Sequence, residues 1–446
     1  MTTPWIEAFK IPADDKRLSE LLRVHPEPLN LAGMSATTAW RIIDDALKRM
    51  YVPSKQDLRI IRKIVDIFAA HASTYYADHA QYLRNARGKP PLLIDPPMIM
   101  FTGPAGVGKS QLAAALDRLL CVREPVPVGE DLEPFHHRPV VRVEVESNLS
   151  GSGMLNIIAD SLGLQQQYER KTKHDVAHLR LRLYQRGCCG LIPDEMQWLS
   201  RSDTSNAHAA KVLTQLAELR LPCLYICNYS LGHKLARRPP EDVARFLSAP
   251  IIMLPEPFDS EDFVRHMADV QSLFPEETFD IVPEQDSEEF HDMSFGLRRK
   301  VGRLYAFGYG GAVEERGGKR GEVRVTMDHI RKVYKSSNYE KDRKTVERSF
   351  AALSGIETER HDYICPFELP PSDEARMRKE ADHWRQRRLN AAEALASRSG
   401  AERTADREAK KQLVKEQRPR SSNLETDRPT PRTPKIRKAA DLLAGL

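Results

Sequence analysis

The chain has 446 residues, of which 41% are hydrophobic and 29% charged, so it can bury more than one core of ordinary size. The net charge of +5 is too small to indicate nucleic-acid binding by itself, but residues 371–446 carry 19 Lys and Arg against 12 Asp and Glu. The N-terminus does not resemble a signal peptide, and no apolar run approaches the roughly 18 residues of a membrane span, which predicts a cytoplasmic protein without a membrane partner. Six scattered cysteines, several of them in apolar runs, predict buried reduced thiols and neither a disulfide framework nor a zinc site.

The sequence pattern of residues 1–85 predicts a helical N-terminal extension. Apolar side chains recur at three- and four-residue spacing in residues 35–50 and again in residues 54–76. Ser54 followed three residues later by Asp57 is typical of a helix N-cap with an acidic first turn. A basic, proline-containing joint then separates the extension from the next part of the chain.

Residues 86–258 predict an α/β domain. Five short apolar runs alternate with segments of helix length, which is typical of a parallel sheet covered by helices on both faces. The predicted strands are residues 97–102, 140–145, 188–192, 223–228 and 251–254. We expect the strands to stop at Pro255.

The sequence pattern of the C-terminal part of the chain predicts a group of helices followed by a tail. Residues 259–340 have the pattern of a small helical domain, and residues 341–446 that of a linker followed by a charged, basic tail. From about residue 371 the composition is typical of a disordered or singly helical segment. Residues 435–446 form a short amphipathic patch, which suits a partner-docking peptide as well as a piece of core.

The segment FTGPAGVGKSQLAAAL at residues 101–116 contains a phosphate-binding loop of the pattern G-x-x-x-x-G-K-S, between an apolar strand and a predicted helix. Its glycines let backbone amides turn toward phosphates, and the helix start adds a partial positive charge. We expect Lys109 to reach the β and γ phosphates and Ser110 to bind magnesium; a chance glycine-rich turn is the alternative. The predicted nucleotide-binding residues are Gly103, Pro104, Ala105, Gly106, Val107, Gly108, Lys109, Ser110 and Gln111.

Two acidic residues follow the third predicted strand. Asp194 is expected to hold the metal, directly or through water, and Glu195 to orient and deprotonate the attacking water. The alternative is that the pair only caps the next helix. Pro193 lacks the amide donor that a central strand needs, so we expect it to be the last residue of the strand.

Further polar residues follow the later strands. Asn228 ends the fourth predicted strand, where its side chain can touch the γ phosphate or the catalytic water, although Asn also simply favours strand ends. Arg237, Arg238 and Arg245 precede the last strand, and one of them can supply positive charge to a neighbouring subunit's nucleotide. Solvated surface charge is the ordinary alternative.

The order of these motifs over about residues 86–336 resembles that of the AAA+ ATPases. Arg298 and Arg299 complete this order, because they begin a helix of the small domain and one of them can lean over the nucleotide. Within the superfamily the chain is most similar to the transposition-regulator ATPases of the TnsC/TniB/MuB group. The segments that carry this similarity are residues 50–64, 194–200, 209–231 and 234–246.

The resemblance implies an α/β fold, namely an AAA+ P-loop NTPase with a parallel five-stranded sheet, a helical lid, a helical N-terminal extension and a disordered basic tail. It implies ATP and Mg²⁺ as cofactors. It also implies that Asn228 is a first sensor, Arg245 the arginine finger and Arg298 a second, nucleotide-binding sensor. Two departures stand against it: Pro193 interrupts the usual aliphatic run, and the extensions carry no motif that matches a named partner.

The family's function implies a homo-oligomer, a ring or a helical filament, that assembles with ATP on double-stranded DNA. It implies contacts with a target-selector protein and with transposase subunits, made by residues 1–85 and by the tail, and disassembly on ATP hydrolysis. Candidate DNA contacts are Arg170, Lys171 and Lys173, although an exposed basic loop is the plain alternative. No base-reading module is evident in the sequence, so DNA binding is expected to be independent of sequence.

Two other functions remain open from the sequence. One is a helicase loader or replication initiator, which is also a DNA-associated AAA+ ATPase. The other is a nucleotide-switched scaffold that binds proteins and not DNA, which the near-neutral charge of residues 1–370 allows.

Overall fold

The structure is a computed structural model, and the chain divides into two compact units, residues 1–385 and residues 386–446. The second unit is described only as far as residue 397, by the end of one helix. The described residues are 3–88, 96–122, 125, 136–146, 149–164, 175–200, 205–317, 323–354 and 361–397.

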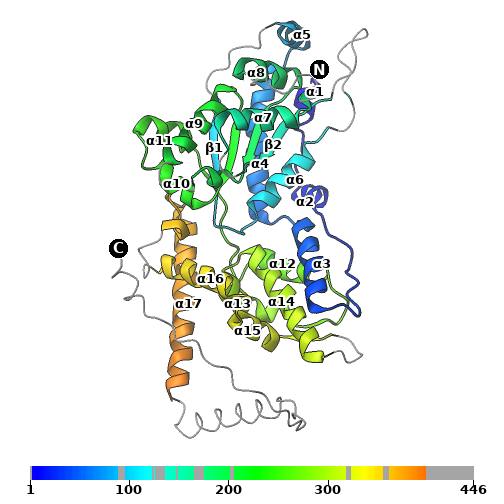
Figure 1. Cartoon of the computed structure of the whole chain (residues 1–446), viewed down its shortest axis with the longest axis vertical. Coiled ribbons are helices and arrows are strands. Elements are labelled where there is room, and N and C mark those ends of the chain that lie inside the picture. Colours follow the sequence, from blue (N-terminus) through cyan, green and yellow to red (C-terminus); the bar gives the residue numbers. More distant parts are fainter. Residues whose placement is uncertain are drawn as a thin grey trace, which may run out of the picture. The chain divides into compact units, whose positions relative to one another are not determined.

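A parallel sheet with helices around it forms the centre of the first unit (Figure 1). It has five strands in the order β2-β3-β4-β1-β5. The strands are β1 (Met98–Thr102), β2 (Val140–Glu144), β3 (Gly190–Asp194), β4 (Cys223–Cys227) and β5 (Ile251–Ile252). Each corresponds to one of the five predicted apolar runs, so the predicted parallel sheet is confirmed. Because parallel strands are joined by crossovers, all five carboxyl ends lie at one edge of the sheet.

Helices cover both faces of this sheet. Alternate residues of β1 illustrate the two faces: Ile99 and Phe101 belong to one buried core, and Met98 and Met100 to the other. The surrounding helices are α6 (Lys109–Leu119), α7 (Gly151–Ser161), α8 (Val176–Gln185), the 3₁₀ helix η2 (Met196–Ser200), α9 (Ser205–Glu218), α10 (Tyr229–Leu235) and α11 (Pro240–Phe246).

Pro193 is the last residue but one of β3, and not the last as predicted. Asp194 completes the strand by pairing with Glu144 of β2. The pairing of β3 with β4 is at Leu191, whose amide donates to the Pro222 carbonyl. Since alternate residues of a strand face the same neighbour, the missing amide of Pro193 falls on the β4 side, beyond that pair.

The predicted N-terminal extension is helical, but its helices are divided between two cores. It contains α1 (Pro4–Glu7), α2 (Asp15–Leu22), α3 (Ala36–Arg49), α4 (Lys55–Tyr75) and α5 (His79–Arg87). Helix α4 begins after Ser54 with the predicted cap, in which Ser54 and Asp57 bond each other's backbone amides. Buried residues of α1, α2, α4 and α5 join the core of the sheet, whereas α3 packs into the core of the helical lid.

The lid consists mainly of helices, as predicted. They are α12 (Glu261–Gln271), α13 (Pro283–Ser294), α14 (Arg298–Arg316) and α15 (Met327–Lys335). The prediction that strands stop at Pro255 is wrong in one detail, because β6 (Phe279–Asp280) and β7 (Val325–Thr326) pair in parallel. Two-residue strands are too short to leave a periodic pattern in the sequence.

After the lid, the predicted linker contains a packed helix, and the segment from residue 371, predicted as disordered or singly helical, begins as a single helix. Helix α16 (Glu340–Leu353) buries Val346 and Phe350, and a 3₁₀ turn, η3 (His361–Tyr363), leads to α17 (Pro371–Ser397). The Trp384 ring of α17 stacks on Phe350 with their centroids 4.6 Å apart. The sequence did not predict this packing, because the few apolar side chains, spaced as on one helix face, stand among many charged ones.

A buried acid holds α17 against α13 in a pH-dependent way. The Glu380 side chain is 10% exposed, and its Oε2 lies 3.5 Å from Nε2 of His291. Burial raises the pKa of Glu380 from its ordinary value near 4.5 to about 7, although Arg376 opposes the shift. Burial lowers the pKa of His291 to about 3, so this contact is between neutral groups from about pH 3 to about pH 7.

We therefore expect stability to fall as the pH rises from about 4.5 to about 7, and to change little above that range. The folded chain holds the Glu380 proton more tightly than the unfolded chain, so the stabilisation is complete below pH 4.5 and is lost as the pH rises through about 7. Between pH 5 and pH 8, the free energy of unfolding should fall by about 2 kcal/mol more in the wild type than in Glu380→Gln. Denaturant unfolding at several pH values measures this, and parallel curves for the two proteins would contradict it.

Two further observations concern the cysteines and the length and apolar character of the helices. All six cysteines are free thiols, and Cys188, Cys189, Cys223 and Cys227 are buried, as predicted. Among the described helices, none combines the length and the apolar character needed to cross a lipid bilayer.

Candidate nucleotide-binding site

The predicted phosphate-binding loop joins the end of β1 to the start of α6. Gly108 caps α6 with a φ of +124°, a backbone conformation that L side chains rarely adopt. A Cβ atom on Gly103 would lie 2.4 Å from the carbonyl oxygen of Met253, so the backbone just after β5 approaches the loop too closely for any side chain there. The sequence therefore folds this segment as a bare backbone loop at a helix N-terminus, the arrangement that binds phosphates.

Lys109 lies inside the loop and is 7% exposed. Its ammonium group donates to the carbonyl oxygens of Gly103 at 2.8 Å and Pro104 at 2.9 Å, and to Oδ1 of Asn228 at 2.9 Å. Burial lowers the pKa of Lys109 to about 8. The structure thus brings the lysine together with Asn228, which follows β4 and caps α10.

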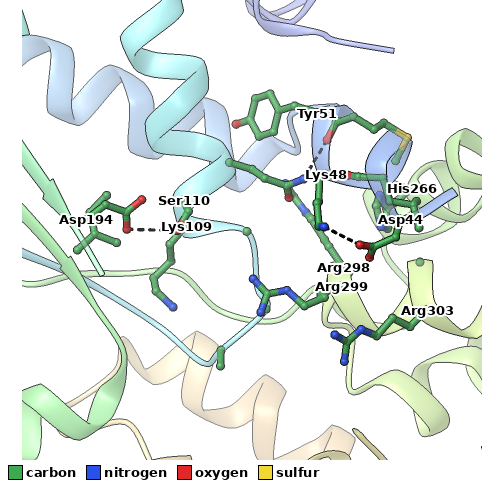
Figure 2. Close-up of a pocket in the computed structure, with 18 of the residues that line it drawn as sticks. Asp44, Lys48, Tyr51, Lys109, Ser110, Asp194, His266, Arg298, Arg299 and Arg303 are labelled. Atoms are coloured by element: carbon green, nitrogen blue, oxygen red, sulfur yellow. Dashed lines mark hydrogen bonds and ion pairs between the residues drawn. The ribbon is translucent and has the colours of Figure 1, made fainter. Parts of the chain in front are cut away.

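Ser110 and Asp194 also meet at this edge of the sheet (Figure 2). The Ser110 hydroxyl donates to Oδ1 of Asp194 at 3.2 Å, and the Asp194 residue is 1% exposed. A hydroxyl and a carboxylate are hard oxygen ligands of the kind that Mg²⁺ uses beside phosphates and waters. These two residues therefore fit the predicted metal site.

Arg142 was not predicted as part of the site. Its Nη2 lies 3.0 Å from Oδ2 of Asp194, and it comes from the interior of β2, the neighbouring strand. In the sequence it stands among valines of a predicted strand, with no motif around it, so only the register of β2 on β3 reveals the contact.

Glu195 lies directly after β3 in the left-handed region, with a φ of +62°. Its Oε2 accepts hydrogen bonds from the Trp198 indole N–H at 3.1 Å and from the Gln197 amide. Glu195 lines the same cavity as Lys109 and Ser110. The five polar residues predicted from the sequence, Lys109, Ser110, Asp194, Glu195 and Asn228, are therefore brought together.

These residues line a cavity of about 460 Å³, and its other walls come from α3 and the lid. The Gln111 amide donates to the carbonyl oxygens of Leu47 at 3.3 Å and Met50 at 3.0 Å, which attaches α6 to the end of α3. The sequence did not predict the wall residues Trp40, Asp44, Leu47, Lys48, Met50, Tyr51, Val52, His266, Gly302 and Arg303. They share no motif, and only the amphipathic pattern of α3 showed that it packs on something.

Residues 94–229 match the family model of an AAA domain. The protein has the AAA+ P-loop fold. This domain and the residues gathered at its loop support a nucleotide-binding ATPase in general. No curated protein matches the sequence.

Three solved structures resemble the chain with low sequence identity. One is the Orc1 protein of Aeropyrum pernix in complex with DNA, with 18% identity and a TM-score of 0.38 over 64% of this chain and 71% of that chain. Another is Cdc6p of Pyrobaculum aerophilum, with 14% identity and a TM-score of 0.42 over 77% and 89%. The ADP form of the Aeropyrum pernix ORC2 protein matches with 13% identity and a TM-score of 0.38 over 71% and 94%.

The two adjacent arginines at the start of α14 meet the AAA+ domain differently. Arg298 is buried, and its Nη1 lies 2.7 Å from Oδ2 of Asp57 while Nη2 lies 3.6 Å from Oε1 of Glu256. Arg299 is exposed, and its amide donates to the Gly106 carbonyl at 3.2 Å. Both line the cavity, and Figure 2 shows the Arg299 side chain extending toward the side of the loop where Lys109 lies.

The remaining predicted residues lie away from the nucleotide cavity of the AAA+ domain. Arg245 is exposed on α11 and lines a separate hollow beside the start of β1, together with Glu241 and Ser248. Arg238 lies in the turn before α11 and pairs with Asp242 of that helix at 2.9 Å. The predicted DNA contacts Arg170, Lys171 and Lys173 lie outside the described residues.

Proposed function

We propose that the protein is an ATP-hydrolysing AAA+ switch that regulates DNA transposition. The observation that carries the ATPase part is the meeting of Lys109 with Asn228, and of Ser110 with Asp194, at the carboxyl edge of one parallel sheet. A phosphate loop, a metal-binding pair and a polar residue at the next strand are the parts that phosphoryl transfer to water needs.

In the proposed reaction, Lys109 leaves the carbonyl oxygens of Gly103 and Pro104 and binds the β and γ phosphates. The Ser110 hydroxyl and the Asp194 carboxylate would hold Mg²⁺, which would neutralise phosphate charge. Glu195 accepts the proton of the attacking water, for which its carboxylate must turn from the Trp198 and Gln197 donors. Asn228 orients the water or the γ phosphate. Arg298, or its exposed neighbour Arg299, contacts the nucleotide from the lid.

We propose that ATP also joins neighbouring subunits of a ring or filament. Arg245 supports this, because it is exposed on α11 and lines a hollow separate from its own nucleotide cavity. An arginine in that position is available to another subunit's γ phosphate, where it would stabilise the charge of the transition state. ATP then favours the assembled state only if it binds that state more tightly than the free subunit.

The transposition part of the proposal rests on the sequence resemblance to the TnsC/TniB/MuB group and on the basic surplus of residues 371–446. The assembly would form on double-stranded DNA through phosphate contacts, independent of base sequence. It would link a target-selector protein to transposase subunits, and hydrolysis at Glu195 would take it apart. The N-terminal helices and the C-terminal segment are the proposed partner contacts.

Electron microscopy of the purified protein with duplex DNA, with a slowly hydrolysed ATP analogue or with ADP, tests this proposal. We expect rings or filaments on DNA only with the ATP analogue, and their loss in salt well above physiological strength. Arg245→Ala should prevent assembly-dependent hydrolysis and keep nucleotide binding, while Arg238→Ala, at the candidate whose guanidinium is paired with Asp242, should keep both. Loss of hydrolysis in Arg238→Ala but not in Arg245→Ala would contradict the assignment of Arg245. Dispersed particles without DNA under both conditions would favour the protein scaffold.

A further inference from the structure

A segment that follows the lid returns to the AAA+ domain and packs on α10. It comprises residues 361–369, and we call it the strap. The carbonyl oxygen of Ile364 accepts a hydrogen bond from Nε2 of His233 at 2.8 Å. The thiol of Cys365 lies beside the hydroxyl of Tyr229, a residue that is 4% exposed.

The strap and α10 are also in close steric contact. A Cβ atom on Gly232 would lie 2.7 Å from Cγ of Pro366, closer than real Cβ contacts, so Gly232 leaves the room that the proline ring occupies. The next nearest atoms, Sδ of Met100 and Cε2 of Phe367, are 3.6 Å away, which is an ordinary contact distance. The obstacle to a methyl group at Gly232 is therefore the Pro366 ring alone.

All three contacts fall on one face of the helix directly behind Asn228. Tyr229, Gly232 and His233 are spaced by three and four residues, so they share a face of α10. Asn228 is the N-cap of this helix, and its Oδ1 accepts from Lys109 at 2.9 Å. A seven-residue helix is marginal on its own, so packing sets its position, and the strap supplies much of that packing.

The helix before the strap, α16, contacts the lid helix α14, which also lines the nucleotide cavity. The strap lies in the chain between α16 and α17, and Asp342 of α16 accepts from Arg303 of α14 at 2.8 Å and also pairs with Lys300. Arg303 lines the nucleotide cavity. The lid is thus connected to the phosphate loop in two ways. One is the hydrogen bond from the Arg299 amide to Gly106, and the other runs from α14 through α16 and the strap to α10.

We propose that the strap is a positioning element for ATP hydrolysis, which holds α10 so that Asn228 meets Lys109 and the γ phosphate. Gly232, Tyr229 and His233 on α10, and Pro366 on the strap, are the positioning residues. The proposal rests on the proposed ATP hydrolysis at this site, and it adds that the chain beyond the lid takes part in setting the rate.

A pair of substitutions tests the contact. Gly232→Ala adds a methyl group against Pro366 and should push the strap from α10; alanine is the better helix former, so α10 itself does not suffer. We expect kcat for ATP hydrolysis to fall about tenfold while KM changes by less than about threefold, since positioning acts on the reacting geometry more than on binding. Pro366→Ala removes Cγ, so the double variant should recover to within about twofold of wild type.

Several outcomes would overturn the positioning role. They are a Gly232→Ala variant with wild-type kcat, a loss that Pro366→Ala does not rescue, or a parallel loss of kcat and nucleotide affinity. Hydrogen exchange in the nucleotide-free full chain separates this proposal from that of ATP hydrolysis. Faster exchange of residues 103–110 and 226–235 in Gly232→Ala, reversed in the double variant, supports the strap even if the wild type hydrolyses no ATP; unchanged exchange would contradict it.

Discussion

Replacing Glu195 with Gln is expected to lower the rate of ATP hydrolysis by about two to four orders of magnitude and to leave ATP binding within a few-fold of the wild type. The amide keeps the size of the side chain and its place beside Trp198, but it cannot take a proton from water. Because the loop residues that bind phosphate are unchanged, the variant should hold ATP and remain in the ATP-bound assembly. Phosphate release and equilibrium binding of a fluorescent ATP analogue measure the two effects.

Two controls make this result specific to the general base. Trp198→Phe removes the indole N–H that Oε2 of Glu195 accepts at 3.1 Å, but it keeps the carboxylate, so hydrolysis should persist. Lys109→Ala removes the group expected on the phosphates, so it should lose nucleotide binding as well as hydrolysis. If Glu195→Gln hydrolyses ATP at the wild-type rate, another group deprotonates the water and the assignment of Glu195 is wrong.

The sequence predicted the central sheet and the polar edge of the site because both depend on local patterns. Short apolar runs separated by helical segments give a parallel sheet, and such strands deliver their following residues to one edge. Asp194 and Asn228 follow different strands and meet the loop for this reason. The glycine at position 108 could be predicted too, since the loop requires a backbone conformation that other residues resist.

The parts that escaped prediction depend on contacts between distant segments. Helix α3 was predicted as part of an N-terminal extension, yet its buried residues belong to the core of the lid. Its amphipathic pattern predicts a buried face but does not show that the lid covers it. Arg142 meets Asp194 only through strand register. Helix α17 carries few apolar residues among its charges, so composition concealed its docking on Phe350. The spacing of apolar residues predicts which face of a helix is buried, but it does not predict which other element that face packs against.

Replacing Asp57 with Ala is expected to lower the free energy of unfolding by about 3–5 kcal/mol. Asp57 is fully buried at the start of α4, and its Oδ2 lies 2.7 Å from Nη1 of Arg298. The same oxygen accepts from the Tyr51 hydroxyl at 3.1 Å and from the Ser54 amide at 3.2 Å. Among the acidic groups of the described residues, removing the carboxylate leaves the buried guanidinium with the more distant Glu256 at 3.6 Å, which is the costly case for a buried ion pair. Urea denaturation of both proteins measures the difference.

A double variant then separates the structural role of Arg298 from its implied role as a nucleotide sensor. Arg298→Met in the Asp57→Ala background removes the unpaired charge and fills similar volume, so it should recover much of the lost stability. If ATP affinity is also recovered, Arg298 acts chiefly by holding α4 to the lid, and its exposed neighbour Arg299 is the better sensor. If stability returns and ATP affinity does not, the guanidinium of Arg298 itself contacts the nucleotide. A loss below about 1 kcal/mol in Asp57→Ala would show that the buried pair is not what joins these elements.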